Sequence, residues 1–134
     1  MHRCQLDVCD FHALAGQLSN TRPQIPAADT ATRQHALVRE EVKELLAAIA
    51  DGDLVEIADS VCDVLYVVYG VMEVYGIDLE PCWNIVHSFN MRKAAESPGY
   101  AGTEVKGGKL VKPSGWVPPQ AALKEELLRQ GMKA

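Results

Sequence analysis

The sequence has no hydrophobic run long enough to cross a membrane. Its longest apolar stretch, residues 64–72, spans nine residues, whereas a membrane helix needs about 20. Residues 1–7 contain no apolar segment of the kind found in secretory signals. Charged residues make up 23% and apolar residues 48% of the chain, proportions typical of globular proteins, which excludes a disordered chain. We therefore expect a soluble, cytoplasmic protein with no membrane partner.

The chain also lacks the cysteine and histidine patterns of several metal sites. Its four cysteines form no C-x-x-C pair, and Cys4, Cys9 and His12 do not have the spacing of a zinc site. No Glu-x-x-His pair is present, although a di-iron carboxylate bundle would require such pairs. We expect free thiols in a reducing compartment.

Apolar residues recur with the 3.6-residue period of amphipathic helices along most of the chain. The pattern predicts helices at residues 5–18, from about 30 to 50, 53–75 and about 78–94. A segment rich in glycine, proline and lysine follows at residues 97–119, and then a short helix at about 119–131. With 134 residues, we expect one all-α domain spanning residues 1–134, a four-helix bundle whose core lies within about residues 5–94.

Short polar residues and glycine predict where these helices begin and end. Asp29 or Thr30 is expected to cap the second helix, and Asp53 the third, because a side-chain oxygen can bond the free amides of a first turn. Gly52 is expected to end the second helix in the left-handed conformation. Trp83, on the fourth helix, is expected to contribute to the core.

Charge is distributed unevenly along the chain. Residues 40–80 carry eleven acidic side chains and one lysine, a net charge of −10, whereas residues 81–134 carry a net charge of +4. Such a chain lacks the broad basic face that binds duplex DNA, so we expect no nucleic-acid partner. An acidic centre beside a basic tail would suit a ligand that is both anionic and metal-bound. A mixed, solvated surface is the alternative.

Six carboxylates lie on two consecutive helices joined by a tight turn, three on one face of each helix. They are Glu40, Glu41 and Glu44, in the pattern E-E-x-x-E, and Glu56, Asp59 and Asp63, at positions i, i+3 and i+7. In an antiparallel hairpin these faces would meet, although like charges on a helix face repel by roughly 0.2–0.5 kcal/mol per pair. A bound cation would offset that cost, so we predict a shared divalent-cation site. Because every ligand is a hard carboxylate oxygen, Mg²⁺ or Mn²⁺ is favoured over Zn²⁺ or Cu²⁺.

Some of these acids have local structural roles as alternatives. Glu56 is the third residue of a potential capping box opened by Asp53. The glutamates of E-E-x-x-E could instead pair with Arg39 or Lys43 on a solvated face.

Combined with later motifs, the acid pattern resembles a known family. The first part of the pattern is E-E-x-x-E, a short turn, and then acids that lead into Val64-Leu65-Tyr66. Two further motifs follow: Asn90-x-x-Lys93, and G-K-x-x-K-P-x-G-W at residues 108–116. Over about residues 6–119, these elements resemble the MazG-like, all-α nucleoside triphosphate pyrophosphohydrolases, in particular a compact branch that is similar to phosphoribosyl-ATP pyrophosphohydrolase. The resemblance implies cleavage of a nucleoside triphosphate to the monophosphate and pyrophosphate, with Mg²⁺ held by two acidic pairs.

The resemblance assigns E-E-x-x-E to the first acidic motif and Asp63 to the second helix. The family's E-x-x-D pattern would place a glutamate three residues before Asp63, where this chain has Ser60. Asp59 or Glu56 would then supply the missing carboxylate, or Glu56 and Asp59 are themselves the pair and Asp63 is a third ligand. Glu41 is the candidate general base that orients the attacking water.

Five residues after position 89 are candidates for substrate binding. The lysines would hold phosphate oxygens opposite the cation, the asparagine would contact sugar or base or else pack at a helix end, and the tryptophan would stack on a base or else cover the bundle. The five are Asn90, Lys93, Lys109, Lys112 and Trp116.

We interpret the chain as an Mg²⁺-dependent enzyme that hydrolyses a ribonucleoside or deoxynucleoside triphosphate and so cleans the nucleotide pool. One alternative is hydrolysis of phosphoribosyl-ATP. Another is a non-catalytic helical binding module whose acids hold a structural cation. The broad apolar helix faces, together with the resemblance, imply a homodimer or homotetramer with sites at or near subunit interfaces.

Overall fold

The computed structural model describes residues 1–97 and 110–133, and these residues form helices and connecting segments without any strand. The helices are α1 (Arg3–Ala15), α2 (Ala28–Asp51), α3 (Leu54–Tyr75), α4 (Leu79–Glu96) and α5 (Gln120–Arg129). The predicted all-α class and the short C-terminal helix are confirmed. Within the described ranges, no helix is both long enough and apolar enough to span a membrane.

The turn between α2 and α3 is formed by local hydrogen bonds that the sequence predicts. Gly52 follows α2 in the left-handed region, with φ 71°. The Asp53 carboxylate accepts hydrogen bonds from the backbone amides of Val55, at 2.9 Å, and Glu56, at 3.2 Å. Both predictions for this turn are confirmed, and together these residues reverse the chain over the two positions between the helices.

The start of α2 differs from the prediction. Ala27 occupies the cap position without a side-chain hydrogen bond, so neither Asp29 nor Thr30 is the N-cap. Asp29 instead lies inside the first turn, where its carboxylate interacts favourably with the positive end of the helix dipole. It also accepts a hydrogen bond from the Thr30 amide at 2.7 Å. An acid in the first turn thus favours the helix start without capping it.

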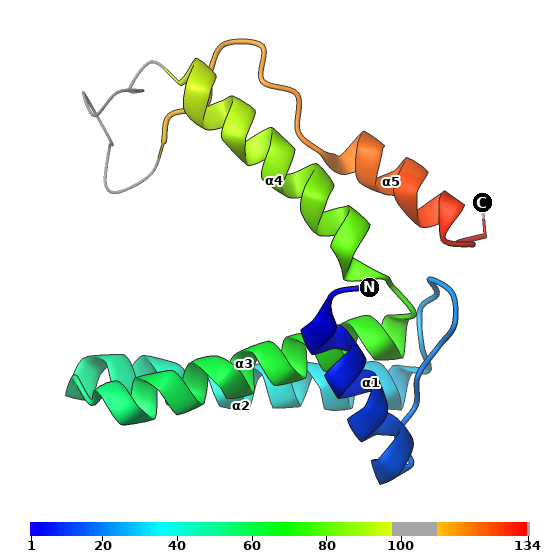
Figure 1. The fold of residues 1–134 in the computed structure, drawn as a ribbon, viewed down its shortest axis with the longest axis vertical. Helices are drawn as coiled ribbons and strands as arrows, with labels where there is room; N and C mark the ends of the chain where they lie inside the picture. The colour runs from blue at the N-terminus through cyan, green and yellow to red at the C-terminus, as the bar shows by residue number, and fades with distance from the viewer. Residues whose placement is uncertain (98–109, 134) are drawn as a thin grey trace.

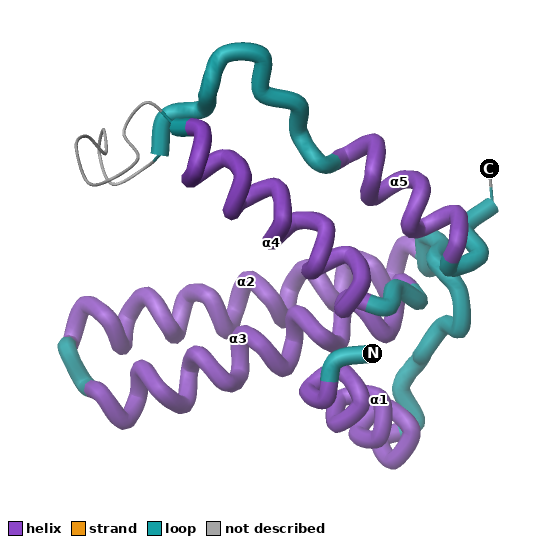
Figure 2. Tube along the Cα trace, turned by 45° about the horizontal axis from the view of Figure 1, so that its top comes forward, coloured by secondary structure: helices purple, strands orange, loops and turns teal. Residues whose placement is uncertain are grey.

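The helices form two groups. α2 and α3 pack as a long antiparallel hairpin, and α1 crosses α3 near the C-terminal end of α3 (Figure 1). α4 leaves the end of α3 in another direction and packs against α5 instead of running along the hairpin (Figure 2). We call α4 and α5 the arm. The C-terminal end of α4 lies apart from α2 and α3 in both views, so the bundle is open in a single chain.

Few apolar side chains are buried within one chain. Trp83, predicted to lie in the core, is 63% exposed, and Leu46 on α2 is 62% exposed. Two packed helices bury only the seam between them, and because α4 turns away, the remaining apolar surface of the hairpin stays uncovered. Among the described residues, the buried apolar side chains are Val8, Ala48, Val74 and Cys82.

Candidate functional site

The carboxylates of E-E-x-x-E lie in the second half of α2, opposite the first half of α3. Glu40 and Glu44 are exposed, and Glu41 is half-buried. Burial raises the pKa of the Glu41 carboxyl, and the negative charges of Glu44, Asp63 and Glu40 raise it further. Asp63 belongs to α3, so carboxylates of both helices share one electrostatic environment. We call Glu40, Glu41, Glu44 and Asp63 the acidic cluster.

No ion pair neutralises the acidic cluster within the described part of the chain. Arg39 and Lys43 lie on the same helix, but together with Glu40 they line a shallow, open groove on α2 without pairing with it. Arg39 and Lys43 therefore do not form the ion pairs with these glutamates that the alternative interpretation expected. The cluster retains a concentrated negative charge.

The three acids of α3 occupy different positions. Asp63 belongs to the acidic cluster, whereas Glu56 and Asp59 lie nearer the turn, and all three are exposed. Ser60 is 8% exposed, so the position at which the resemblance calls for a glutamate faces the seam with α2. Asp59, one residue earlier, is rotated about 100° around the helix from it. Of these three acids, Asp63 is the one whose charge raises the pKa of Glu41.

The chemistry of the acidic cluster fits a hard divalent cation. Its donors are all carboxylate oxygens, which Mg²⁺ and Mn²⁺ prefer, and their mutual repulsion is relieved by a cation between them. Within the described residues, no three aspartate, glutamate, histidine or cysteine side chains converge as a ready-made metal site. Holding a cation therefore requires these side chains to change rotamer, which exposed residues do within nanoseconds.

Four of the five predicted substrate-binding residues lie on α4 or in the described segment before α5. Asn90 is exposed and Lys93 is half-buried, both in the last turns of α4, and Lys112 is exposed. Lys109 lies outside the described residues. Because α4 diverges from the hairpin, Asn90 and Lys93 are not brought to the acidic cluster of the same chain (Figure 1).

Trp116 packs against α4. Its ring meets the Phe89 ring edge-on, with centroids 6.1 Å apart. The Arg92 guanidinium lies 4.6 Å from the centroid of Phe89 and 5.2 Å from that of Trp116, the geometry of cation–π contacts. Two roles were expected for Trp116, stacking on a base or covering the bundle, and these contacts correspond to packing. They tie the segment before α5 back onto the end of α4.

A family model for phosphoribosyl-ATP pyrophosphohydrolase matches residues 8–90, from α1 into α4, including the whole acidic cluster. The chain belongs to this family. The phosphoribosyl-ATP pyrophosphohydrolase family is part of the MazG-like, all-α superfamily, so the resemblance stated from the motifs is confirmed.

One similar protein comes from a virus. An uncharacterized protein of Acanthamoeba polyphaga mimivirus is 36% identical to this pyrophosphohydrolase-family chain over 97 residues. The match covers 69% of the chain and 36% of the viral protein. The chain thus spans about a third of the length of that relative.

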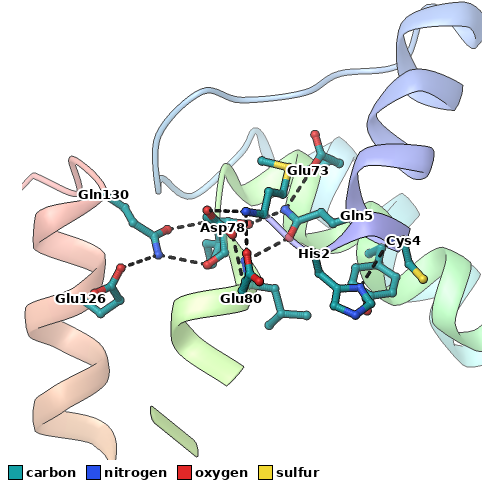
Figure 3. A network of polar contacts seen from close by, with 12 residues as sticks. His2, Cys4, Gln5, Glu73, Asp78, Glu80, Glu126 and Gln130 are labelled. Atoms are coloured by element: carbon teal, nitrogen blue, oxygen red, sulfur yellow. Dashed lines mark hydrogen bonds and ion pairs between the residues drawn. The ribbon is translucent and has the colours of Figure 1, made fainter. Parts of the chain in front are cut away.

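Sequence reasoning missed a buried polar network at the junction of α3 and α4 (Figure 3). Gln5 is 1% exposed, Glu73 5% and Glu126 6%. In this pyrophosphohydrolase-family chain, the network joins residues of α1, α3, α4 and α5. One signal was present: Gln5 shares a helix face with Val8 and His12, where an apolar residue is expected.

Proposed function

We propose that this chain hydrolyses a ribonucleoside or deoxynucleoside triphosphate to the monophosphate and pyrophosphate, in a reaction dependent on Mg²⁺ or Mn²⁺, and so cleans the cytoplasmic nucleotide pool. The observation that carries the proposal is the acidic cluster: four carboxylates on two packed helices, without an ion-pair partner in the described residues. Membership of a pyrophosphohydrolase family supports the reaction type.

Phosphoryl transfer needs positioned groups and charge neutralisation more than covalent participation by the protein. Bound Mg²⁺ would neutralise the phosphate chain. Glu41 is the proposed general base, because its carboxyl is half-buried within the acidic cluster. Glu41 would take a proton from a water molecule while the water oxygen bonds to phosphorus. The bond from that phosphorus to the oxygen bridging the α and β phosphates then breaks, which separates the monophosphate from pyrophosphate.

We also propose that the active form is a homodimer or homotetramer. Exposed apolar side chains such as Leu65 and Trp83 support association, because they line a hollow of about 440 Å³ between α3 and α4. The separation of the acidic cluster from the end of α4 within one chain also supports an assembly, because the lysines of the same chain do not reach the acids. In an assembly, Lys93 and Lys112 of one chain would approach phosphates held at the acids of another.

Phosphoribosyl-ATP is a second candidate substrate, favoured by the family match over residues 8–90. Its hydrolysis also releases pyrophosphate, so the two candidates share the acidic cluster and differ in what is bound beyond the phosphates.

A turnover panel of phosphoribosyl-ATP and all ribo- and deoxyribonucleoside triphosphates, with Mg²⁺ or with EDTA, tests the proposal. We expect Mg²⁺-dependent release of pyrophosphate from at least one substrate. Hydrolysis in ¹⁸O-labelled water then identifies the attacked phosphorus from the product that gains the label. No pyrophosphate from any substrate would contradict the proposal. Calorimetric binding of Mg²⁺ but of no non-hydrolysable nucleotide would then indicate a cation-stabilised binding module.

A further inference from the structure

The turn between α3 and α4 contains backbone amides that α4 cannot satisfy itself. Gly76 ends α3 in the left-handed conformation, with φ 68°, and α4 begins at Leu79. The amides of Asp78 and Leu79 lie at the very start of α4, where no earlier helical carbonyl is available, so they need acceptors from elsewhere. The direction in which α4 leaves α3 therefore depends on the groups that supply those partners.

Gln5 of α1 bonds this turn from one side. Its side-chain nitrogen donates to the carbonyl of Ile77 at 2.7 Å, and its side-chain oxygen accepts from the amide of Leu79 at 3.0 Å. The same nitrogen also donates to the buried carboxylate of Glu73, 3.0 Å away. Both hydrogens and the oxygen of the Gln5 amide are engaged, so the hydrogen bonds fix the orientation of this buried side chain.

Gln130, the C-cap of α5, bonds the turn from the other side (Figure 3). Its side-chain oxygen accepts from the amide of Asp78 at 2.9 Å, and its nitrogen donates to the carbonyl of the same residue at 3.0 Å. That nitrogen also lies 3.0 Å from the buried carboxylate of Glu126. Each glutamine therefore bonds both the turn and a buried glutamate: Gln5 bonds Glu73, and Gln130 bonds Glu126.

The end of α3 is held separately. The Asn20 side chain and the Gln24 amide donate to carbonyls in its last turn, at 2.6 and 3.0 Å. The amino group of Met1 lies 2.7 Å from the Glu80 carboxylate, but both groups are partly exposed, so that ion pair contributes little. The partly buried contacts of the two glutamines join the start of α4 to α1 and to the end of α5.

We propose that Gln5 and Gln130 are positioning residues that fix the angle between α3 and α4, and with it the placement of Lys93 relative to the acidic cluster of a partner chain. Lys93 lies about 21 Å along α4 from Leu79, at 1.5 Å per residue. A change of roughly 10° at the turn would move Lys93 by about 4 Å, more than the length of a hydrogen bond. The catalytic part of this inference rests on the proposed function, in which Lys93 holds substrate phosphates.

The test uses Gln130→Met and Gln5→Met, which keep the side-chain length and remove the hydrogen bonds. Gln120→Met, on α5, and Gln17→Met, just after α1, are matched controls at exposed positions. Pulsed electron paramagnetic resonance would measure the distance between spin labels on α3 and α4 in the full chain, diluted with unlabelled protein. The labels would be attached at Val55→Cys and Met91→Cys, exposed sites in a variant without the native cysteines.

We expect both test variants, and neither control, to widen the distribution of label distances. Hydrogen exchange should accelerate about three- to tenfold at the Asp78 amide in Gln130→Met and at the Leu79 amide in Gln5→Met, the usual effect of losing one hydrogen bond. The KM for the best substrate should rise by about the same factor. The affinity for Mn²⁺ without nucleotide should not change, because the acidic cluster lies on other helices.

Unchanged label distances and unchanged exchange in Gln130→Met would overturn the inference, and so would a fall in Mn²⁺ affinity as large as the change in KM. Wider distances with an unchanged KM would overturn the placement of Lys93. Gln130 is only half-buried, so this variant decides the question even if Gln5→Met fails to fold. If the wild-type protein releases no pyrophosphate, the proposed function fails, while distances and exchange still decide whether the glutamines fix the angle.

Discussion

Asp63 on α3 lies close enough to Glu41 on α2 for its negative charge to raise the pKa of the Glu41 carboxyl. The two residues are on opposite sides of the α2–α3 turn in sequence, and the antiparallel hairpin brings them together. This pairing of acids across two helices is the smallest unit of the proposed metal and catalytic site.

Replacing Glu44 by glutamine should lower Mg²⁺-dependent pyrophosphate release about 100-fold or more, because the variant loses a metal ligand while keeping its size. Helical circular dichroism should not change, since Glu44 is exposed. Glu125→Gln, an exposed glutamate on α5, is the control and should retain full activity. Equal activity in the two variants would remove Glu44 from the site.

The acids of α3 should differ in their contribution to cation binding. Asp63→Asn should weaken Mn²⁺ binding about tenfold or more, because Asp63 belongs to the acidic cluster. Asp59→Asn and Glu56→Gln should bind Mn²⁺ nearly as the wild type does, because both acids lie nearer the turn than the acidic cluster does. Titration calorimetry would measure the three affinities. A larger loss in Asp59→Asn than in Asp63→Asn would favour the alternative in which Glu56 and Asp59 are the metal-binding pair.

Self-association should depend on the apolar hollow between α3 and α4. Leu65→Asp places a charge in that hollow and should shift the protein toward the monomer in size-exclusion chromatography with light scattering, because burying an unpaired charge is costly. Ile25→Asp, at an equally apolar and 83% exposed position of the connector, is the control. A Leu65→Asp variant with the wild-type mass would place the interface elsewhere.

The four free cysteines should differ in reactivity. Burial raises the pKa of the Cys82 thiol, and the same cause raises that of Cys9. A raised pKa leaves less thiolate at a given pH, so both should be alkylated more slowly than the exposed Cys4 and Cys62 at pH 8. Mass spectrometry after a time course with iodoacetamide would give the order. Modification of Cys82 before Cys4 would indicate that α5 separates from α4.

Most of the helices and part of the site were predictable because they depend on local interactions. The periodicity of apolar residues located the helices, Asp53 and Gly52 formed their turn through bonds to near neighbours, and helix geometry alone placed the acids of E-E-x-x-E together. The predicted cap of α2 was wrong because an acid such as Asp29 favours a helix start from within the first turn as well as from the cap.

The sequence by itself therefore determined the all-α class, the family and which acids lie near one another on α2. Only the tertiary structure decided which of the three predicted acids of α3 influences Glu41, that Ser60 faces the seam and that Trp83 is exposed, since each depends on which helix packs opposite. The direction of α4 is decided by the hydrogen bonds of Gln5 and Gln130 to one turn. These residues are far apart in the chain, and no periodic pattern encodes a contact made through side-chain amides.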